Sequence, residues 1–139
     1  MAAAPFPTRI WKKFTKTVTF DGGTGTGAIG TVAIATVTGR VQIMTGSAYC
    51  STLLAGATAT VELGVATATA GLIAQTTATD IDAAEYWQDT TPETKISPLI
   101  TNVAVTGNII LTVGTAGVDS GVLEFVFYWL PESASGNLG

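Results

Sequence analysis

The sequence has no histidine, a single cysteine and few charged residues. Without histidine the chain cannot build a Ser-His-Asp or Cys-His arrangement, and Cys50 has no base near it in sequence that would activate its thiol. A single cysteine forms neither an intramolecular disulfide nor a zinc site of the CxxC type. We expect Cys50 to be a small buried apolar residue, and we expect no enzyme activity, no cofactor and no metal site.

Charged residues make up 12% of the 139 residues, about half of the usual share, while hydrophobic residues make up 47%. Threonine, alanine and glycine fill most of the remaining positions. A chain of this length forms one domain, and a surface made of such residues suits packing against other copies or another protein. The alternative is a monomer whose threonine-rich faces are simply well hydrated.

Long apolar runs are also missing, because none approaches the roughly 18 residues that a membrane helix needs. The first residues, MAAAPFPTRIWKK, place the apolar part before the charges, which is the reverse order of a secretory signal. We therefore expect a soluble protein that is made in the cytosol and has no membrane partner.

The charges are unevenly distributed along the chain. Residues 1–20 hold four of the six cations and no acid, whereas residues 21–139 hold all ten acids and two cations, a net charge of −8. Phosphate contacts come from clustered lysine and arginine, so an acidic body argues against a nucleic-acid partner.

The N-terminal residues 1–13 are predicted to be an extended arm ahead of a single domain over residues 14–139, because Pro5 and Pro7 interrupt them and they lack periodicity. Aromatic residues and arginine are frequent interface anchors. The acidic body of a sister subunit is a complementary partner for such a basic segment. The candidate partner-binding residues are Phe6, Arg9, Ile10, Trp11, Lys12, Lys13 and Phe14.

The rest of the chain alternates with the period of two that is typical of strands. Alternating stretches lie at residues 14–20, 31–38, 41–45, 58–66, 99–105, 108–114 and 122–130. The last, VLEFVFYWL, is apolar on both faces, which indicates the middle of a sheet or a contact between subunits. The pattern predicts an all-β fold, an antiparallel sandwich of jelly-roll or immunoglobulin-like layout with about seven to nine strands.

The stretch DGGTGTGAIG matches the G-x-G-x-x-G spacing of dinucleotide-binding folds at Gly25, Gly27 and Gly30. That fingerprint requires a helix after the glycines, whose N-terminus binds the pyrophosphate. A strand pattern follows instead. We interpret the stretch as a flexible connection between two strands, in which glycine takes φ values that other residues avoid.

One acidic cluster surrounds Tyr86 and Trp87, and its residues are Asp80, Asp82, Glu85, Asp89 and Glu93. It is compatible with sugar binding, sugar cleavage or calcium binding, although it lacks the glycine and the distant glutamate of a calcium loop. A solvated acidic loop is the simpler interpretation. Trp87 is expected to cap the core, and residues 79–89 to form either a turn or two of helix or a loop that enters a short strand.

Three longer stretches carry a resemblance: WKKFTKTVTFDGGTGTGAIGTVAIATVTG, LIAQTTATDIDAAEYWQD and VLEFVFYWLP. With these, the chain from Trp11 onward resembles small virion proteins of tailed bacteriophages, and among them head decoration, or cement, proteins. The resemblance implies a β-rich homotrimer without catalysis that binds the major capsid protein on the exterior of the virion and reinforces the lattice. A tail, fibre or carbohydrate-binding receptor module is the alternative, for which Tyr86 and Trp87 would provide the sugar-stacking rings.

Overall fold

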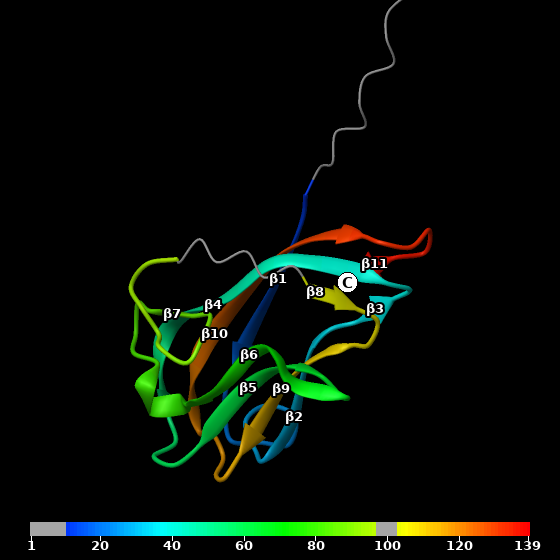
Figure 1. Cartoon of the computed structure of the whole chain (residues 1–139). Coiled ribbons are helices and arrows are strands. Elements are labelled where there is room, and N and C mark those ends of the chain that lie inside the picture. The colour runs from blue at the N-terminus through cyan, green and yellow to red at the C-terminus, as the bar shows by residue number, and fades with distance from the viewer. Residues whose placement is uncertain (1–10, 97–102) are drawn as a thin grey trace, which may run out of the picture.

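The computed structural model describes residues 11–96 and 103–139, and these residues form two antiparallel sheets and a small two-stranded ribbon (Figure 1). In the first sheet, the long strand β4 pairs with β10, and β10 pairs with β1. The far side of β4 pairs with β8 near its start and with β7 near its middle. The strands of this sheet are β1 (Lys12–Thr19), β4 (Val41–Ala55), β7 (Tyr86–Trp87), β8 (Val103–Val105) and β10 (Ser120–Pro131).

The second sheet has the strand order β2-β9-β5-β6, and the ribbon pairs β11 with β3. A short 3-10 helix, η1 (Ala78–Asp80), follows β6. The strands are β2 (Gly30–Ala35), β5 (Thr60–Val65), β6 (Ala68–Thr77) and β9 (Ile109–Gly114), with β3 (Val37–Thr38) and β11 (Asn137–Leu138) in the ribbon.

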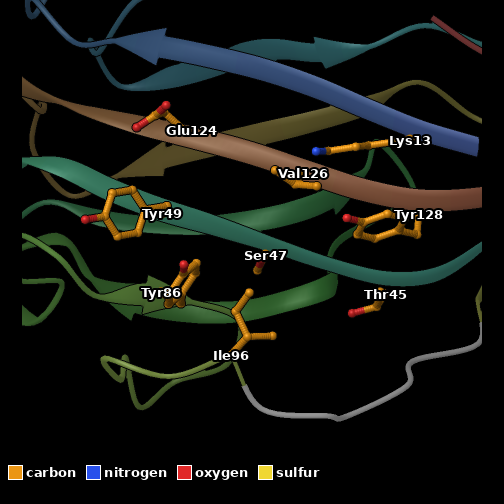
Figure 2. A pocket seen from close by; sticks show the side chains of 9 residues that line it. All are labelled: Lys13, Thr45, Ser47, Tyr49, Tyr86, Ile96, Glu124, Val126 and Tyr128. Atoms are coloured by element: carbon orange, nitrogen blue, oxygen red, sulfur yellow. The ribbon is translucent and has the colours of Figure 1, made fainter.

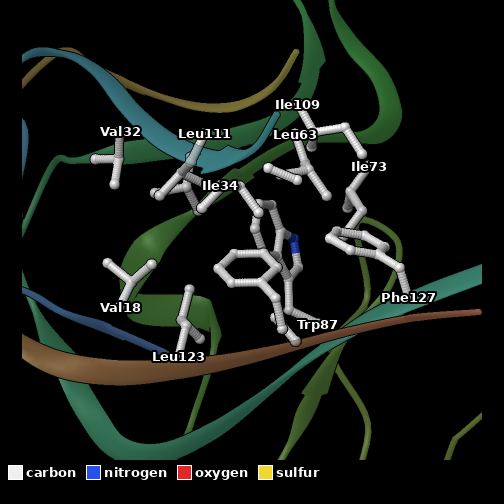
Figure 3. Close-up of a cluster of buried hydrophobic side chains, with 14 of the residues drawn as sticks. Val18, Val32, Ile34, Leu63, Ile73, Trp87, Ile109, Leu111, Leu123 and Phe127 are labelled. Atoms are coloured by element: carbon white, nitrogen blue, oxygen red, sulfur yellow. The ribbon is translucent and has the colours of Figure 1, made fainter. Parts of the chain in front are cut away.

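The core lies between the two sheets, where the inward residues of both meet (Figure 3). Strand β10 contributes every second side chain to it, and β9 does the same from the opposite sheet. Rings form a continuous row across the first sheet, with centroid separations of 6.1 Å for Phe14–Phe127, 6.2 Å for Phe127–Phe125 and 6.3 Å for Phe125–Trp87. The predicted all-β antiparallel sandwich is therefore confirmed, as is the central position of β10 within its sheet.

Several strand limits differ from the prediction. The described residues contain eleven strands, more than seven to nine, because β3, β7 and β11 have only two residues each. Strand β6 was not anticipated, since its small and polar residues carry no clear alternation. Strand β4 continues ten residues beyond Thr45, because Gly46 leaves room for the Phe127 ring, which lies opposite it in the ladder.

The boundary between the N-terminal arm and the domain also differs from the prediction. Strand β1 begins at Lys12, and Lys12 and Lys13 pair with Trp129 and Tyr128 of β10. The predicted boundary after residue 13 is thus two residues too late. The two lysines looked like part of the basic arm by charge, although they continue the alternation of the strand.

The glycine-rich stretch links β1 to β2, as predicted, and no helix follows it. Four of its glycines, Gly22, Gly25, Gly27 and Gly30, have positive φ. Within the loop, Asp21 accepts hydrogen bonds from the Thr26 hydroxyl and the Gly23 N–H. The Gly27 carbonyl accepts a further bond from the Val118 N–H at 2.7 Å, which fastens the loop to the chain just before β10.

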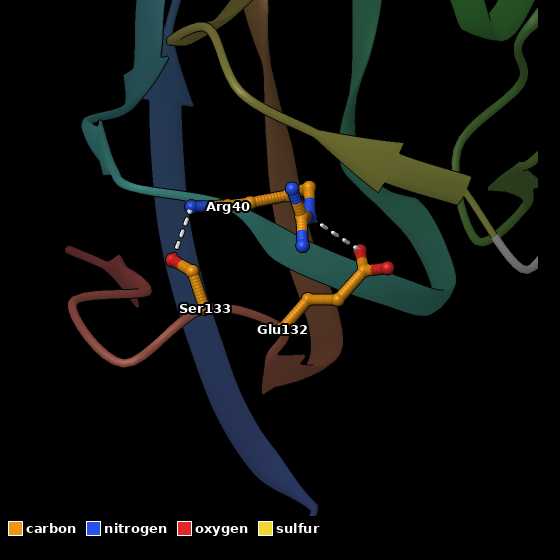
Figure 4. Close-up of polar contacts among 3 residues, drawn as sticks. All are labelled: Arg40, Glu132 and Ser133. Atoms are coloured by element: carbon orange, nitrogen blue, oxygen red, sulfur yellow. Dashed lines mark hydrogen bonds and ion pairs between the residues drawn. The ribbon is translucent and has the colours of Figure 1, made fainter.

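The turn between β3 and β4 is fastened by the residues that follow β10 (Figure 4). The Arg40 N–H donates to Ser133 Oγ at 3.0 Å, and the Arg40 carbonyl accepts from the N–H groups of Glu132 and Ser133. Arg40 Nε also lies 3.4 Å from Glu132 Oε2, but both side chains are about half exposed, so this ion pair contributes about 0–1 kcal/mol. These contacts hold the start of β4, which runs from here into the surface described next.

Candidate functional site

The outer face of the first sheet is hollowed into a concavity of about 320 Å³ (Figure 2). Strands β1, β4, β7 and β10 contribute to it, because alternation turns every second side chain away from the core. On β10 the outward residues are Glu124, Val126 and Tyr128, between inward residues that are all buried. The remaining lining residues are Lys13, Thr45, Ser47, Tyr49, Tyr86 and Ile96.

A second, apolar groove of about 330 Å³ adjoins the concavity. It is lined by Trp11, Met44, Thr45 and Tyr128, and it shares Thr45 and Tyr128 with the concavity. A β-bulge creates it: in the ladder Tyr128 pairs with Thr45 and Trp129 pairs with Ile43, so Met44 is an extra residue. Bulges re-aim side chains, and this one brings Met44 and Thr45 into the same groove.

Rings dominate the exposed surface of this face. Trp11 is 43% exposed and Tyr128 is 39% exposed. At the other end of the concavity Tyr49 and Tyr86 lie side by side, with ring centroids 5.1 Å apart, because β7 pairs Tyr86 directly with Tyr49. Exposed aromatic surface next to small polar residues is typical of a binding surface, since each ring offers a large contact area with few rotamers to fix.

Two charged residues line the concavity, one at each end. Lys13 pairs with Tyr128, and Glu124 lies four residues earlier on β10, so about 13 Å of strand separates the two positions. The face therefore presents Lys13 beside Tyr128 at one end and Glu124 beside Tyr49 at the other, with Val126 and Ser47 between them.

The structure divides the predicted partner-binding residues into three groups. Phe6, Arg9 and Ile10 lie outside the described residues. Trp11 and Lys13 lie on the outer face, within the groove and the concavity. The remaining two point to the inner side: Lys12 Nζ lies 5.2 Å from the centroid of the Trp129 ring, and Phe14 stacks on Phe127.

The residues around the acidic cluster behave as the simpler interpretation predicted. Residues 78–87 form the 3-10 helix η1, a loop and the short strand β7. Glu85 Oε2 accepts a hydrogen bond from the Asp82 N–H at 2.9 Å, which stabilises the loop itself. Over residues 11–96 and 103–139, no three carboxylate or cysteine side chains converge in a way that suits a metal ion.

Trp87 cannot stack on a sugar, since none of its surface is exposed and its indole N–H donates to Thr76 Oγ1 at 2.9 Å. It caps the core, as predicted. Cys50 is likewise buried, its thiol donates to the Thr52 carbonyl at 3.2 Å, and burial raises the pKa of the thiol. Only Tyr86 of the proposed sugar-stacking pair remains available to a ligand.

The partner-binding residues predicted from sequence left out most of the outer face, including Tyr49, Met44 and Tyr128. A signal for Tyr128 was present, because VLEFVFYWL is apolar on both faces and a subunit contact was one interpretation of that pattern. No local signal marked Met44 or Tyr49. Their place depends on the bulge and on the pairing of β4 with β7.

Comparison with protein-family models, with curated proteins and with solved structures finds no match for this chain. Among the residues that the structure describes, there is no helix of the length and apolarity needed to cross a membrane.

Proposed function

We propose that the protein is a structural component of a tailed-phage virion that binds the major capsid protein on the exterior of the head and stabilises the lattice as a decoration protein. The observation that carries the proposal is the outer face of the first sheet, with its rings and its two separated charges. Such a face is suited to a protein partner: it joins apolar anchors to a polar rim, which is the usual composition of an interface.

We assign the capsid contact to the concavity, and within it to Tyr49, Tyr86 and Glu124. A protein loop that lies against the paired Tyr49 and Tyr86 rings would cover them, while a cation on it would meet Glu124. Because the remaining lining residues include Thr45 and Ser47, hydrogen bonds to a backbone are also available. A contact of this size is weak for one copy.

Binding by several copies at once makes a weak contact effective. In the proposed homotrimer, three concavities would engage the lattice together, and avidity raises the affinity above that of one site by orders of magnitude. A ligand present at a hundredfold excess over its Kd stabilises the state that it binds by about 2.7 kcal/mol per site. Decoration of this kind strengthens an assembled shell without catalysis.

The proposal is tested on particles of the phage or prophage whose genome encodes the chain. Immunogold labelling of purified particles is expected to mark heads and to leave tails unlabelled. Tyr86→Ala protein, added to particles that lack the native chain, is expected to bind at least about tenfold more weakly than wild type, the loss typical of an interface anchor. Ile29→Ala, which also removes an exposed apolar side chain but lies in the loop before β2, provides the control. Labelled tails, or heads without label, contradict the proposal.

The alternative function, a carbohydrate-binding receptor module, retains one specific observation in its favour. Tyr49, Tyr86 and Tyr128 all line one concavity, and tyrosine combines an apolar ring with a hydroxyl that can bond a sugar. A glycan array distinguishes the two functions. Reproducible binding of one glycan class that is lost in Tyr86→Ala favours the receptor module. Trp87 is not a suitable control, because its substitution removes a buried ring.

A further inference from the structure

The apolar groove formed by Trp11, Met44, Thr45 and Tyr128 lies where the described chain begins. Trp11 is at once a wall of the groove and the residue at which the N-terminal segment joins the domain. That segment, residues 1–10, reads MAAAPFPTRI and contains Pro5, Phe6 and Pro7. A groove of apolar and aromatic walls and a proline-rich segment thus occur in the same chain, a short distance apart in sequence.

Proline-rich segments and aromatic grooves recognise each other for a general reason. Proline restricts φ, so a Pro-x-Pro segment is already close to the extended polyproline conformation and loses little entropy on binding. Tryptophan and tyrosine rings provide flat walls for the proline rings and can donate a hydrogen bond to the exposed carbonyls. At about 330 Å³ the groove is at the lower end of the range of ligand pockets, about 300–1,000 Å³, and fits a few side chains of a peptide.

We propose that the groove binds the Pro5-Phe6-Pro7 segment of a second copy of the chain, so that exchanged arms link the subunits of the oligomer. The reach sets how closely the subunits must pack, because the five residues from Phe6 to Trp11 span at most about 17–18 Å when extended. Charge agrees for the body as a whole, because Arg9 accompanies the segment and residues 21–139 have a net charge of −8. At the groove itself Lys13 pairs with Tyr128, so the apolar walls rather than a carboxylate would hold the segment.

Exchange between copies is favoured over binding within one copy by the residues between the segment and the groove. To fold back onto its own groove, the chain would have to reverse direction within Thr8, Arg9 and Ile10. Reversals favour glycine, proline, asparagine, aspartate or serine, and none of these stands at Thr8, Arg9 or Ile10, although Pro7 directly precedes them. An arm that continues away from its own domain reaches a neighbour without such a turn.

The three tryptophans supply a direct readout of groove occupancy. Trp11 is 43% exposed, whereas Trp87 and Trp129 are buried. A peptide that enters the groove should therefore shift the emission of Trp11 to shorter wavelength and leave the other two rings unaffected. The titration uses protein that lacks residues 1–10 and a synthetic MAAAPFPTRI peptide, with MAAAAAATRI as a control of equal length and charge.

Saturable binding of MAAAPFPTRI, and none of MAAAAAATRI, is the expected result. Met44→Lys places a like charge in the groove opposite the basic arm, and is expected to weaken peptide binding at least about tenfold. Ile29→Lys adds the same charge at an exposed position outside the groove and should change nothing. Equal binding of both peptides, or no binding of either, overturns the proposal.

Complementation separates exchange between copies from binding within one copy. By light scattering, the full-length chain should have at least twice the 14.1 kDa mass of one chain. The chain without residues 1–10 should be monomeric. Full-length Met44→Lys, with an intact arm, should also be monomeric, yet it should form a complex with the truncated chain, whose groove is intact. A full-length chain that stays monomeric while the peptide binds the truncated form indicates binding within one copy and refutes the exchange. All of these measurements use purified protein, so their failure leaves the capsid proposal standing.

Discussion

At the scale of single residues, the inner face of the first sheet depends on positions where a small side chain leaves room for a ring. Gly46 lies opposite Phe127 in the ladder, and a Cβ added at Gly46 would lie 2.5 Å from Phe127 Cδ1. Real Cβ atoms do not approach a ring carbon so closely. The row of rings from Phe14 to Trp87 therefore requires glycine at this point.

Gly46→Ala is expected to lower the free energy of unfolding by about 1–3 kcal/mol, because the added methyl group displaces the Phe127 ring within a close-packed core. Thermal and denaturant unfolding would measure the change. Gly107→Ala is the matched control, since the nearest atom to its added Cβ is Val65 Cβ at 3.6 Å. Equal stability of the two variants would show that the ring row tolerates the displacement.

The buried indole of Trp87 leads to a second prediction at this scale. Its N–H donates to Thr76 Oγ1, and both side chains are buried. Thr76→Val keeps the shape of the side chain but leaves the indole N–H without this acceptor, at an expected cost of about 1–3 kcal/mol. Urea unfolding followed by tryptophan fluorescence measures the loss. Thr17→Val, at an exposed position of β1, should leave the midpoint almost unchanged, and a similar loss there would contradict this explanation.

At the scale of elements, the glycine-rich loop between β1 and β2 adopts a hydrogen-bonded conformation that positive φ angles make possible. Positive φ at Gly22, Gly25 and Gly27 lets the chain coil tightly, and the coil is then closed by hydrogen bonds to Asp21 and from Val118. A Cβ at Gly27 would overlap the Val118 carbonyl oxygen. The loop thus connects the two sheets at one end of the sandwich.

Asp21 makes the stability of this loop depend on pH. The Thr26 hydroxyl, followed by the Gly23 N–H, lowers the pKa of the Asp21 carboxyl below its ordinary value of 3.8. A depressed pKa in the folded state means that the stabilisation is present above pH 3.8 and is lost as the pH falls below it through the folded value. The difference in urea midpoint between wild type and Asp21→Asn should accordingly shrink below pH 3.8. If the difference in urea midpoint stays constant below pH 3.8, or if Glu62→Gln shows the same pH dependence, the pH dependence arises from the net charge of the protein and not from the hydrogen bonds of Asp21.

At the scale of the whole molecule, the limit of the domain can be tested by two truncations. Removal of residues 1–10 leaves β1 complete, whereas removal of residues 1–13 also takes Lys12 and Lys13 from the ladder and the Lys12 contact from the Trp129 ring. We expect the shorter truncation to change stability by less than about 0.5 kcal/mol. The longer one should cost about 1–2 kcal/mol. Calorimetry of both forms provides the measurement, and equal melting temperatures would place Lys12 and Lys13 outside the folded unit.

The same truncation at residue 10 predicts a loss of capsid retention. If exchanged arms link the subunits, the truncated chain binds the lattice through one concavity at a time and loses the avidity of the oligomer. The truncated chain is added to phage particles that lack the native chain, and binding is measured by co-sedimentation. It should bind more weakly and dissociate faster than the full-length protein. Unchanged retention would mean that a single concavity suffices for binding.

The alternation of residues was enough to predict the all-β sandwich, the two apolar faces of β10 and the absence of a helix after the glycines, because neighbouring side chains of a strand point to opposite faces. The burial of Cys50 and Trp87 was predicted from residue type instead. The length of β4, the strand β6 and the two residues that extend β1 were not predicted. They depend on packing or pairing with segments that are distant in sequence.

The outer face of the first sheet was predicted from the sequence in part, and the rest of it depends on the tertiary structure. The sequence by itself determined that β10 has a second apolar face and that aromatic residues flank the basic segment. Only the tertiary structure decided that Tyr49, Tyr86 and Tyr128 lie on one surface and that a bulge opposite Tyr128 adds Met44 to it. The physical reason is that register between strands arises from contacts of the whole sheet, whereas the direction of each side chain is set by its own strand.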